Sequence, residues 1–95
     1  MFRDVSALEA REIVKNKEVI VLDVRTPKEF RQDHFHHAIN IDFYAEDFKE
    51  KLTQLDRFKV YLVHCHSGRR STKTVQLMEQ MGFKGGFNVK GVLFD

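Results

Sequence analysis

Hydrophobic residues along the chain form either short continuous runs or helically spaced stripes. The runs VIVLD at 19–23 and VYLVH at 60–64 are apolar on both faces and rich in β-branched residues, which is typical of buried parallel strands. Shorter runs at 38–41 and 86–89 predict two further strands. Because these strands alternate with helical segments, the pattern predicts an α/β fold, a small parallel sheet flanked by helices on both faces.

Two short helices are indicated by capping boxes. Ser6 followed by Glu9 three residues later predicts a helix over about 7–15. The segment TPKE at 26–29 carries the same pattern with proline at the first helical position, and it predicts a short helix that ends near Gln32.

Two longer helices are indicated by amphipathic stripes. One lies within 45–55 and the other follows the Gly/Arg segment and stops at Gly82. The stripes consist of Phe48, Leu52 and Leu55 in the first helix and of Thr74, Leu77, Met78 and Met81 in the second.

Length, charge and composition exclude several classes of protein. A length of 95 residues with 42% hydrophobic content predicts one domain, 1–95. A formal net charge of +2 gives no general attraction to nucleic acid, and the phenylalanines follow core stripes rather than a base-stacking pattern. No run approaches the length of a membrane span and the first residues lack the apolar centre of a signal peptide. We therefore expect a cytoplasmic protein with neither membrane nor nucleic-acid partners.

The single cysteine, Cys65, lies where the strand at 60–64 ends and the next helix begins. Open α/β sheets place their sites at such strand ends, and a helix N-terminus offers free amides to an anion. Gly68 lets these amides converge, while Arg69 and Arg70 add positive charge. Such surroundings lower a thiol pKa to about 3.5–7.5. We therefore interpret Cys65 as a nucleophile rather than as a small core residue.

Five histidines accompany the cysteine, but their spacing does not predict a metal site. The HFHH segment has no matched CxxC or HxxxH partner, and residues on either side of a strand end point to different sides. They are His34, His36, His37, His64 and His66. We interpret them as surface or loop residues, with His66 placed to tune the thiolate or meet substrate.

Three ordered blocks resemble the rhodanese-like sulfurtransferases. CHSGRRS is similar to the C-x-x-G-x-R-S active-site loop of that family, and VLDVRTPKEFRQDHFHHAINID at 21–42 and MGFKGGFNVKG at 81–91 are similar to its other conserved stretches. The resemblance implies a small parallel sheet flanked by helices. It also implies transfer of a sulfane sulfur without a cofactor: the thiolate takes the sulfur from a small anionic donor such as thiosulfate and passes it to cyanide or a thiol, possibly on a protein.

The resemblance and the local chemistry together suggest roles for the loop. Its amides would surround the terminal sulfur of a persulfide in the manner of an oxyanion hole. The predicted anion cradle consists of His66, Ser67, Gly68, Arg69, Arg70 and Ser71. Arg70 would anchor the loop or orient the donor, while Arg69 and Lys73 would attract anions. Ser71 and Thr72 are expected to cap the helix.

Other positions are expected to support the loop or to depart from the family. Asp23 and Arg25, at the end of a strand, are predicted to brace neighbouring loops by hydrogen bonds. Asp33 and His37 stand where the family usually has glycine, and His36 stands where it often has proline. The chain ends at GVLFD, before the tryptophan and C-terminal helix usual in the family, so it is short at that end.

Two alternatives remain beside the transferase. Cell-cycle phosphatases share this fold, but their loop has five residues between cysteine and arginine, whereas four separate Cys65 from Arg70 and Ser71 takes the place of the phosphatase arginine. The shorter loop disfavours a phosphatase or an arsenate reductase.

Many domains of this fold are noncatalytic binding or regulatory modules. Those commonly lack the cysteine, so its presence favours the enzyme.

Overall fold

Five parallel strands form one sheet in the order β1-β5-β4-β2-β3. The fold is described by a computed structural model that covers residues 1–94. Its elements are β1 (Phe2–Ser6), α1 (Ala7–Ile13), β2 (Val19–Asp23), α2 (Pro27–Gln32), β3 (Ile39–Asn40), α3 (Phe48–Thr53), β4 (Val60–His64), α4 (Arg69–Gln80) and β5 (Gly85–Lys90). The α/β class and parallel sheet predicted from the sequence are confirmed.

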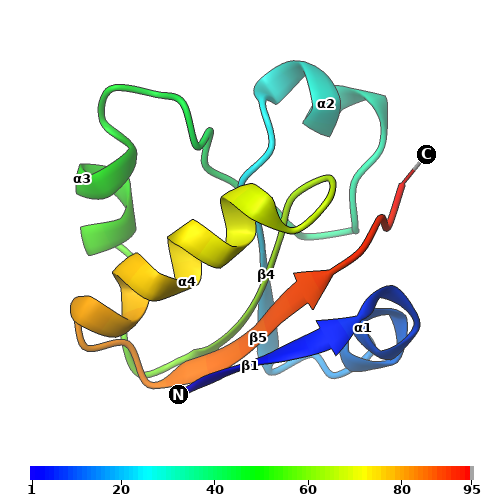
Figure 1. Cartoon of the computed structure of the whole chain (residues 1–95), viewed down its shortest axis with the longest axis horizontal. Coiled ribbons are helices and arrows are strands. Elements are labelled where there is room, and N and C mark those ends of the chain that lie inside the picture. The colour runs from blue at the N-terminus through cyan, green and yellow to red at the C-terminus, as the bar shows by residue number, and fades with distance from the viewer. Residues whose placement is uncertain (95) are drawn as a thin grey trace.

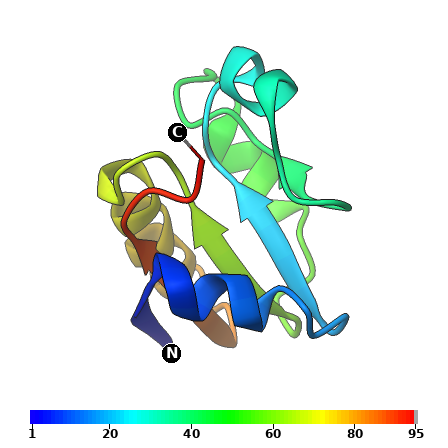
Figure 2. The same ribbon diagram turned by 90° about the vertical axis from the view of Figure 1, so that its right-hand side faces the viewer.

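Helices cover both faces of the sheet, so the protein has two hydrophobic cores. One core, under α3 and α4, includes Leu22, Leu52 and Met78. The other, under α1, includes Ala10 and Leu62. Figure 1 shows α3 and α4 together on one side, and Figure 2 shows α1 on the opposite side of the strands. Alternation along β4 sends Leu62 to one core and its neighbours to the other.

Both capping boxes form as predicted. The amide of Glu9 donates to the hydroxyl of Ser6 at 3.1 Å, and its carboxylate accepts from the Ser6 amide at 2.9 Å. Thr26 and Glu29 make the equivalent pair at the start of α2. The predicted positions of the elements hold, but their ends differ by up to three residues.

The structure adds a strand that the sequence pattern did not predict. β1 pairs with β5 along its whole length at the edge of the sheet. Only Val5 of this strand is buried; Phe2 packs partly buried against the core under α3 and α4, and the other three residues are exposed. Asp4 accepts a hydrogen bond from the amide side chain of Asn88 at 3.0 Å. A strand held mainly by backbone pairing and polar contacts lacks the apolar pattern that reveals a buried strand.

The carboxyl ends of the central strands meet at one edge. β2 pairs with β4 in the register that places Asp23 beside His64. Cys65 follows β4 directly, and α2 follows β2 after a short turn. In residues 1–94 no helix has the length and apolar character needed to cross a membrane.

Candidate active site

The loop between β4 and α4 turns tightly around the side chain of Cys65. Gly68 is the N-cap of α4 and has a φ of 102°, in the left-handed region that favours glycine. A Cβ atom there would also lie 3.3 Å from the carbonyl oxygen of Val89. Glycine therefore allows the chain to fold back over the cysteine and begin the helix in one turn.

Two backbone amides point at the sulfur. The amides of Gly68 and Ser71 donate to Sγ of Cys65 at 3.2 and 3.3 Å, and the Ser71 hydroxyl lies 3.6 Å from the same atom. Burial raises the pKa of the thiol. Hydrogen bonds from Ser71, and from the amides of Gly68 and Arg70, outweigh that effect and hold the pKa below its ordinary value. The loop therefore stabilises the thiolate more than water does for an ordinary cysteine.

Cys65 is nevertheless a buried residue. It is 2% exposed and belongs to the core under α3 and α4. The sequence left a choice between a small apolar core residue and a working thiol, and the structure combines the two. The residue packs in the core, while amides of the loop donate to its sulfur.

Arg70 anchors the loop to α2. Its guanidinium donates two hydrogen bonds to the carboxylate of Glu29, at 2.8 and 3.1 Å. These hydrogen bonds raise the pKa of Arg70 and lower the pKa of Glu29 to about 2. The guanidinium also lies over the ring of Tyr44, 5.7 Å from its centroid. Of the two roles expected for Arg70, the contacts fit that of an anchor.

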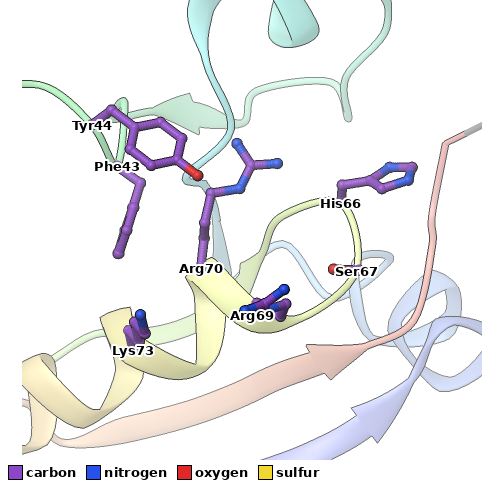
Figure 3. Close-up of a pocket in the computed structure, with 7 residues that line it drawn as sticks. All are labelled: Phe43, Tyr44, His66, Ser67, Arg69, Arg70 and Lys73. Atoms are coloured by element: carbon purple, nitrogen blue, oxygen red, sulfur yellow. The ribbon is translucent and has the colours of Figure 1, made fainter.

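A pocket of about 390 Å³ opens beside the loop. Figure 3 shows the side chains of Tyr44 and Arg70 close together on one side and His66 pointing away from them. The lining residues are Phe43, Tyr44, His66, Ser67, Arg69, Arg70 and Lys73. Arg69 and Lys73 are exposed and have no ion pair within residues 1–94, so their charge is available to an anion.

Asp23 and Arg25 form a buried ion pair behind the loop. Nη2 of Arg25 lies 2.7 Å from Oδ2 of Asp23, and it also donates to the carbonyl oxygen of Asp33 at 2.6 Å. The side-chain amide of Asn40 donates to the carbonyl oxygens of both Asp23 and Arg25 at 2.9 Å. Neither charged residue lines the pocket. These hydrogen bonds join the segments around Asp33 and Asn40 to the end of β2.

His64 joins this buried group from β4. Its Nε2 atom lies 3.5 Å from Oδ2 of Asp23 and has no hydrogen-bond partner, and its Nδ1 lies 3.3 Å from the carbonyl oxygen of Cys65. Burial lowers the pKa of His64 more than the carboxylate of Asp23 raises it. The ring is therefore neutral near pH 7. It packs beside Phe35 with their centroids 5.7 Å apart.

The expectation that Ser71 and Thr72 cap α4 is wrong. Both hydroxyls donate to the carbonyl oxygen of Gly68, at 3.2 and 2.6 Å, and no side chain caps the helix. Because Ser71 lies within the first helical turn, its amide is free to donate to sulfur instead. The absence of a side-chain cap leaves the amides available for the thiolate.

The histidines lie apart. His66 is exposed, but the interpretation of His64 as a surface or loop residue is wrong, because its side chain is fully buried at the end of β4. The other three are exposed in the loop between α2 and β3, where His34 stacks on Phe30 at 3.7 Å and His36 lies 3.9 Å from His37. Within residues 1–94 no cluster of three or more histidine, cysteine or carboxylate side chains has the geometry for a metal ion.

Sequence reasoning missed the far wall of the pocket. Phe43 and Tyr44 follow β3, in a segment without regular structure, and nothing in their local pattern links them to the loop 20 residues later. Glu29 was predicted only as a capping residue, but it also binds Arg70. The sequence held one signal for this pair, namely a capping glutamate, Glu29, together with an arginine, Arg70, that follows the cysteine.

Comparisons with known proteins agree with this geometry. The family described as Rhodanese-like domain matches residues 6–93. Thiosulfate sulfurtransferase GlpE of Coxiella burnetii is 29% identical over 92 residues, which cover 96% of this chain and 83% of the relative. Thiosulfate sulfurtransferase PspE of Escherichia coli is 30% identical over 73 residues, which cover 75% of this chain and 68% of the relative. The crystal structure of a rhodanese-related protein from Thermoplasma volcanium matches with a TM-score of 0.81 at 33% identity, covering 96% of this chain and 86% of that one.

Proposed function

Because the chain belongs to the rhodanese-like domain family, we propose that it is a sulfurtransferase that carries one sulfane sulfur as a persulfide on Cys65. The observation that carries the proposal is the pair of amide hydrogen bonds to Sγ from Gly68 and Ser71. These amides stabilise a thiolate in the resting protein. In a persulfide the negative charge lies on the outer sulfur, so amides of the same loop would have to reach beyond Sγ to stabilise it.

The reaction has two nucleophilic steps. The Cys65 thiolate attacks the outer sulfur of thiosulfate, the bond between the two sulfurs of thiosulfate breaks, and sulfite leaves with the electron pair. Cyanide or a thiolate then attacks the outer sulfur of the persulfide, and the cysteine departs as thiolate. Neither step needs an added oxidant or a cofactor, because the sulfane sulfur moves from one nucleophile to another.

Residues around the loop supply positioning and attraction. Arg69 and Lys73 draw the anionic donor to the pocket. Arg70 is already neutralised by Glu29, so it fixes the loop rather than binding the donor. The low exposure of Cys65 suits a donor that presents a small terminal atom to the sulfur. The loop disfavours a phosphatase, since four residues rather than five separate the cysteine from the arginine.

Steady-state turnover of thiosulfate with cyanide tests the function. We expect activity in the wild type and none in Cys65→Ser, because a serine hydroxyl neither ionises near neutral pH nor forms a persulfide. The matched control is Thr53→Ala, which removes an exposed hydroxyl at the end of α3, outside the loop and the pocket, and keeps the sulfur. Equal turnover in the wild type and Cys65→Ser would exclude the proposed role of the thiol. A folded wild type that turns over no sulfur donor would favour a binding module.

A further inference from the structure

A second pocket adjoins the pocket beside the Cys65 loop. It lies between α3 and α4, has a volume of about 530 Å³, and shares Phe43 and Lys73 with the first. Its lining includes Phe43, Ala45, Phe48, Lys49, Lys73 and Leu77. A molecule bound at the loop can therefore extend along α4 into this second pocket. A small inorganic anion such as thiosulfate has no atoms to place there.

An aromatic wall connects the two pockets. The ring of Phe43 packs edge to face against Tyr44 with their centroids 5.4 Å apart, and against Phe48 at 5.2 Å. Leu77 contributes an aliphatic side chain from α4. Tyr44 belongs to the first pocket, Phe48 to the second, and Phe43 to both. The wall therefore offers an apolar surface that continues away from the loop.

The charged residues around this surface are mainly basic. Lys73 lines both pockets, Lys49 lines the second and Arg69 the first, and all three are exposed. Glu46 is the one acidic residue in the lining of the two pockets. The surroundings thus complement a ligand that combines an anionic group with an apolar one.

We propose that the second pocket is a subsite for the apolar group of an organic sulfur donor, whose anionic sulfur end lies at the Cys65 loop. This inference rests on the sulfurtransferase function proposed above. An organic thiosulfonate illustrates the chemistry. The Cys65 thiolate attacks its outer sulfur, a new sulfur–sulfur bond forms, the bond to the sulfonyl sulfur breaks, and a sulfinate leaves with the electron pair. The aryl or alkyl group of that sulfinate occupies the subsite.

Two donors with the same reacting group test the subsite. For benzenethiosulfonate and methanethiosulfonate, kcat/KM is measured with cyanide as acceptor, and the ratio of the two values is compared among variants. Leu77→Ala removes an apolar contact, and Ala45→Leu fills the pocket. We expect each variant to lower the ratio about tenfold. Most of the change should be a higher KM for benzenethiosulfonate, because the contact is the same in the ground and transition states.

Comparing ratios removes the difference in intrinsic reactivity between the donors. Leu8→Ala is the control, since Leu8 is 75% exposed on α1, on the other side of the sheet, and its ratio should equal that of the wild type. Thermal unfolding establishes that each variant is folded. Because one variant empties the pocket and the other fills it, a packing defect does not explain the same result in both.

The outcomes separate this inference from the function on which it rests. The wild type, Leu77→Ala and Ala45→Leu could all turn over both thiosulfonates with the same ratio of the two kcat/KM values. That result would overturn the subsite and leave the proposed sulfurtransferase function intact. Absence of turnover with thiosulfate and with both thiosulfonates would overturn the function itself.

Discussion

At the scale of single residues, the sulfur of Cys65 combines burial with hydrogen bonding. Burial alone favours a neutral thiol, yet donors from Ser71 and Gly68 reverse the preference and lower the pKa. The donors are mostly backbone amides, so their positions depend on the turn at Gly68 rather than on flexible side chains. These donors would let a residue that is 2% exposed serve as the nucleophile that we propose.

The pKa of Cys65 gives the first residue-scale prediction. Because the folded-state pKa is lowered, the ultraviolet absorbance of the thiolate should persist to a lower pH than that of free cysteine, with Cys65→Ser as the blank. Ser71→Ala removes the hydroxyl that lies 3.6 Å from Sγ and helps to lower the pKa of the thiol, so it should move the midpoint to higher pH. A midpoint at or above that of free cysteine would contradict the electrostatic account of the loop.

His37 gives a second prediction at this scale. Its φ of 65° is the one positive value among non-glycine residues 1–94. His37→Gly should raise the free energy of unfolding by about 0.5–1 kcal/mol, because relief of left-handed strain exceeds the added entropy of the unfolded chain. Urea denaturation measures the change. His36→Gly, at a position without positive φ, should be destabilising, and a similar effect of both substitutions would refute the strain argument.

At the scale of elements, the carboxylate of Glu29 links α2 to α4. It caps the helix that follows β2 and binds the arginine in the first turn of α4. Capping boxes are local patterns, so the sequence predicted both of them correctly. The Glu29–Arg70 pair joins residues that are 41 positions apart, and only the sheet, which places β2 beside β4, brings them together.

Glu29→Gln should lower the free energy of unfolding at pH 7 by about 2 kcal/mol, which allows for solvent screening of this partly exposed pair. The folded pKa of Glu29 is about 2, below the ordinary value of 4.5. Its contribution is therefore complete above pH 4.5 and is lost as the pH falls through about 2. Chemical denaturation at several pH values should show the two proteins converging in acid.

Glu12→Gln is the matched control for this substitution. Glu12 pairs with Lys15 on the surface of the protein, with side chains about 70% exposed, so its loss should cost less than about 0.5 kcal/mol. Equal effects of the two substitutions would mean that the pair between α2 and α4 contributes no more than a surface ion pair.

At the scale of the whole molecule, the parallel sheet assembles the site from distant segments. The apolar patterns of β2 and β4 were sufficient to predict the central strands and the place of Cys65 at their carboxyl edge. The sequence did not predict β1, because a strand with one buried residue, Val5, gives no periodic signal. The pairing of β1 with β5 is also a long-range contact. Tyr44 and Phe43 escaped for the same reason, since only the folded chain places them across from the loop.

The intact mass of the protein after treatment with thiosulfate tests the central claim most directly. If the Cys65 loop stabilises a persulfide, the wild type should gain about 32 Da, the mass of one sulfur atom, and lose it again on addition of cyanide. Cys65→Ser should gain nothing under the same conditions. A folded wild type with a reactive thiol but no such adduct, or an equal gain of mass in Cys65→Ser, would contradict the account.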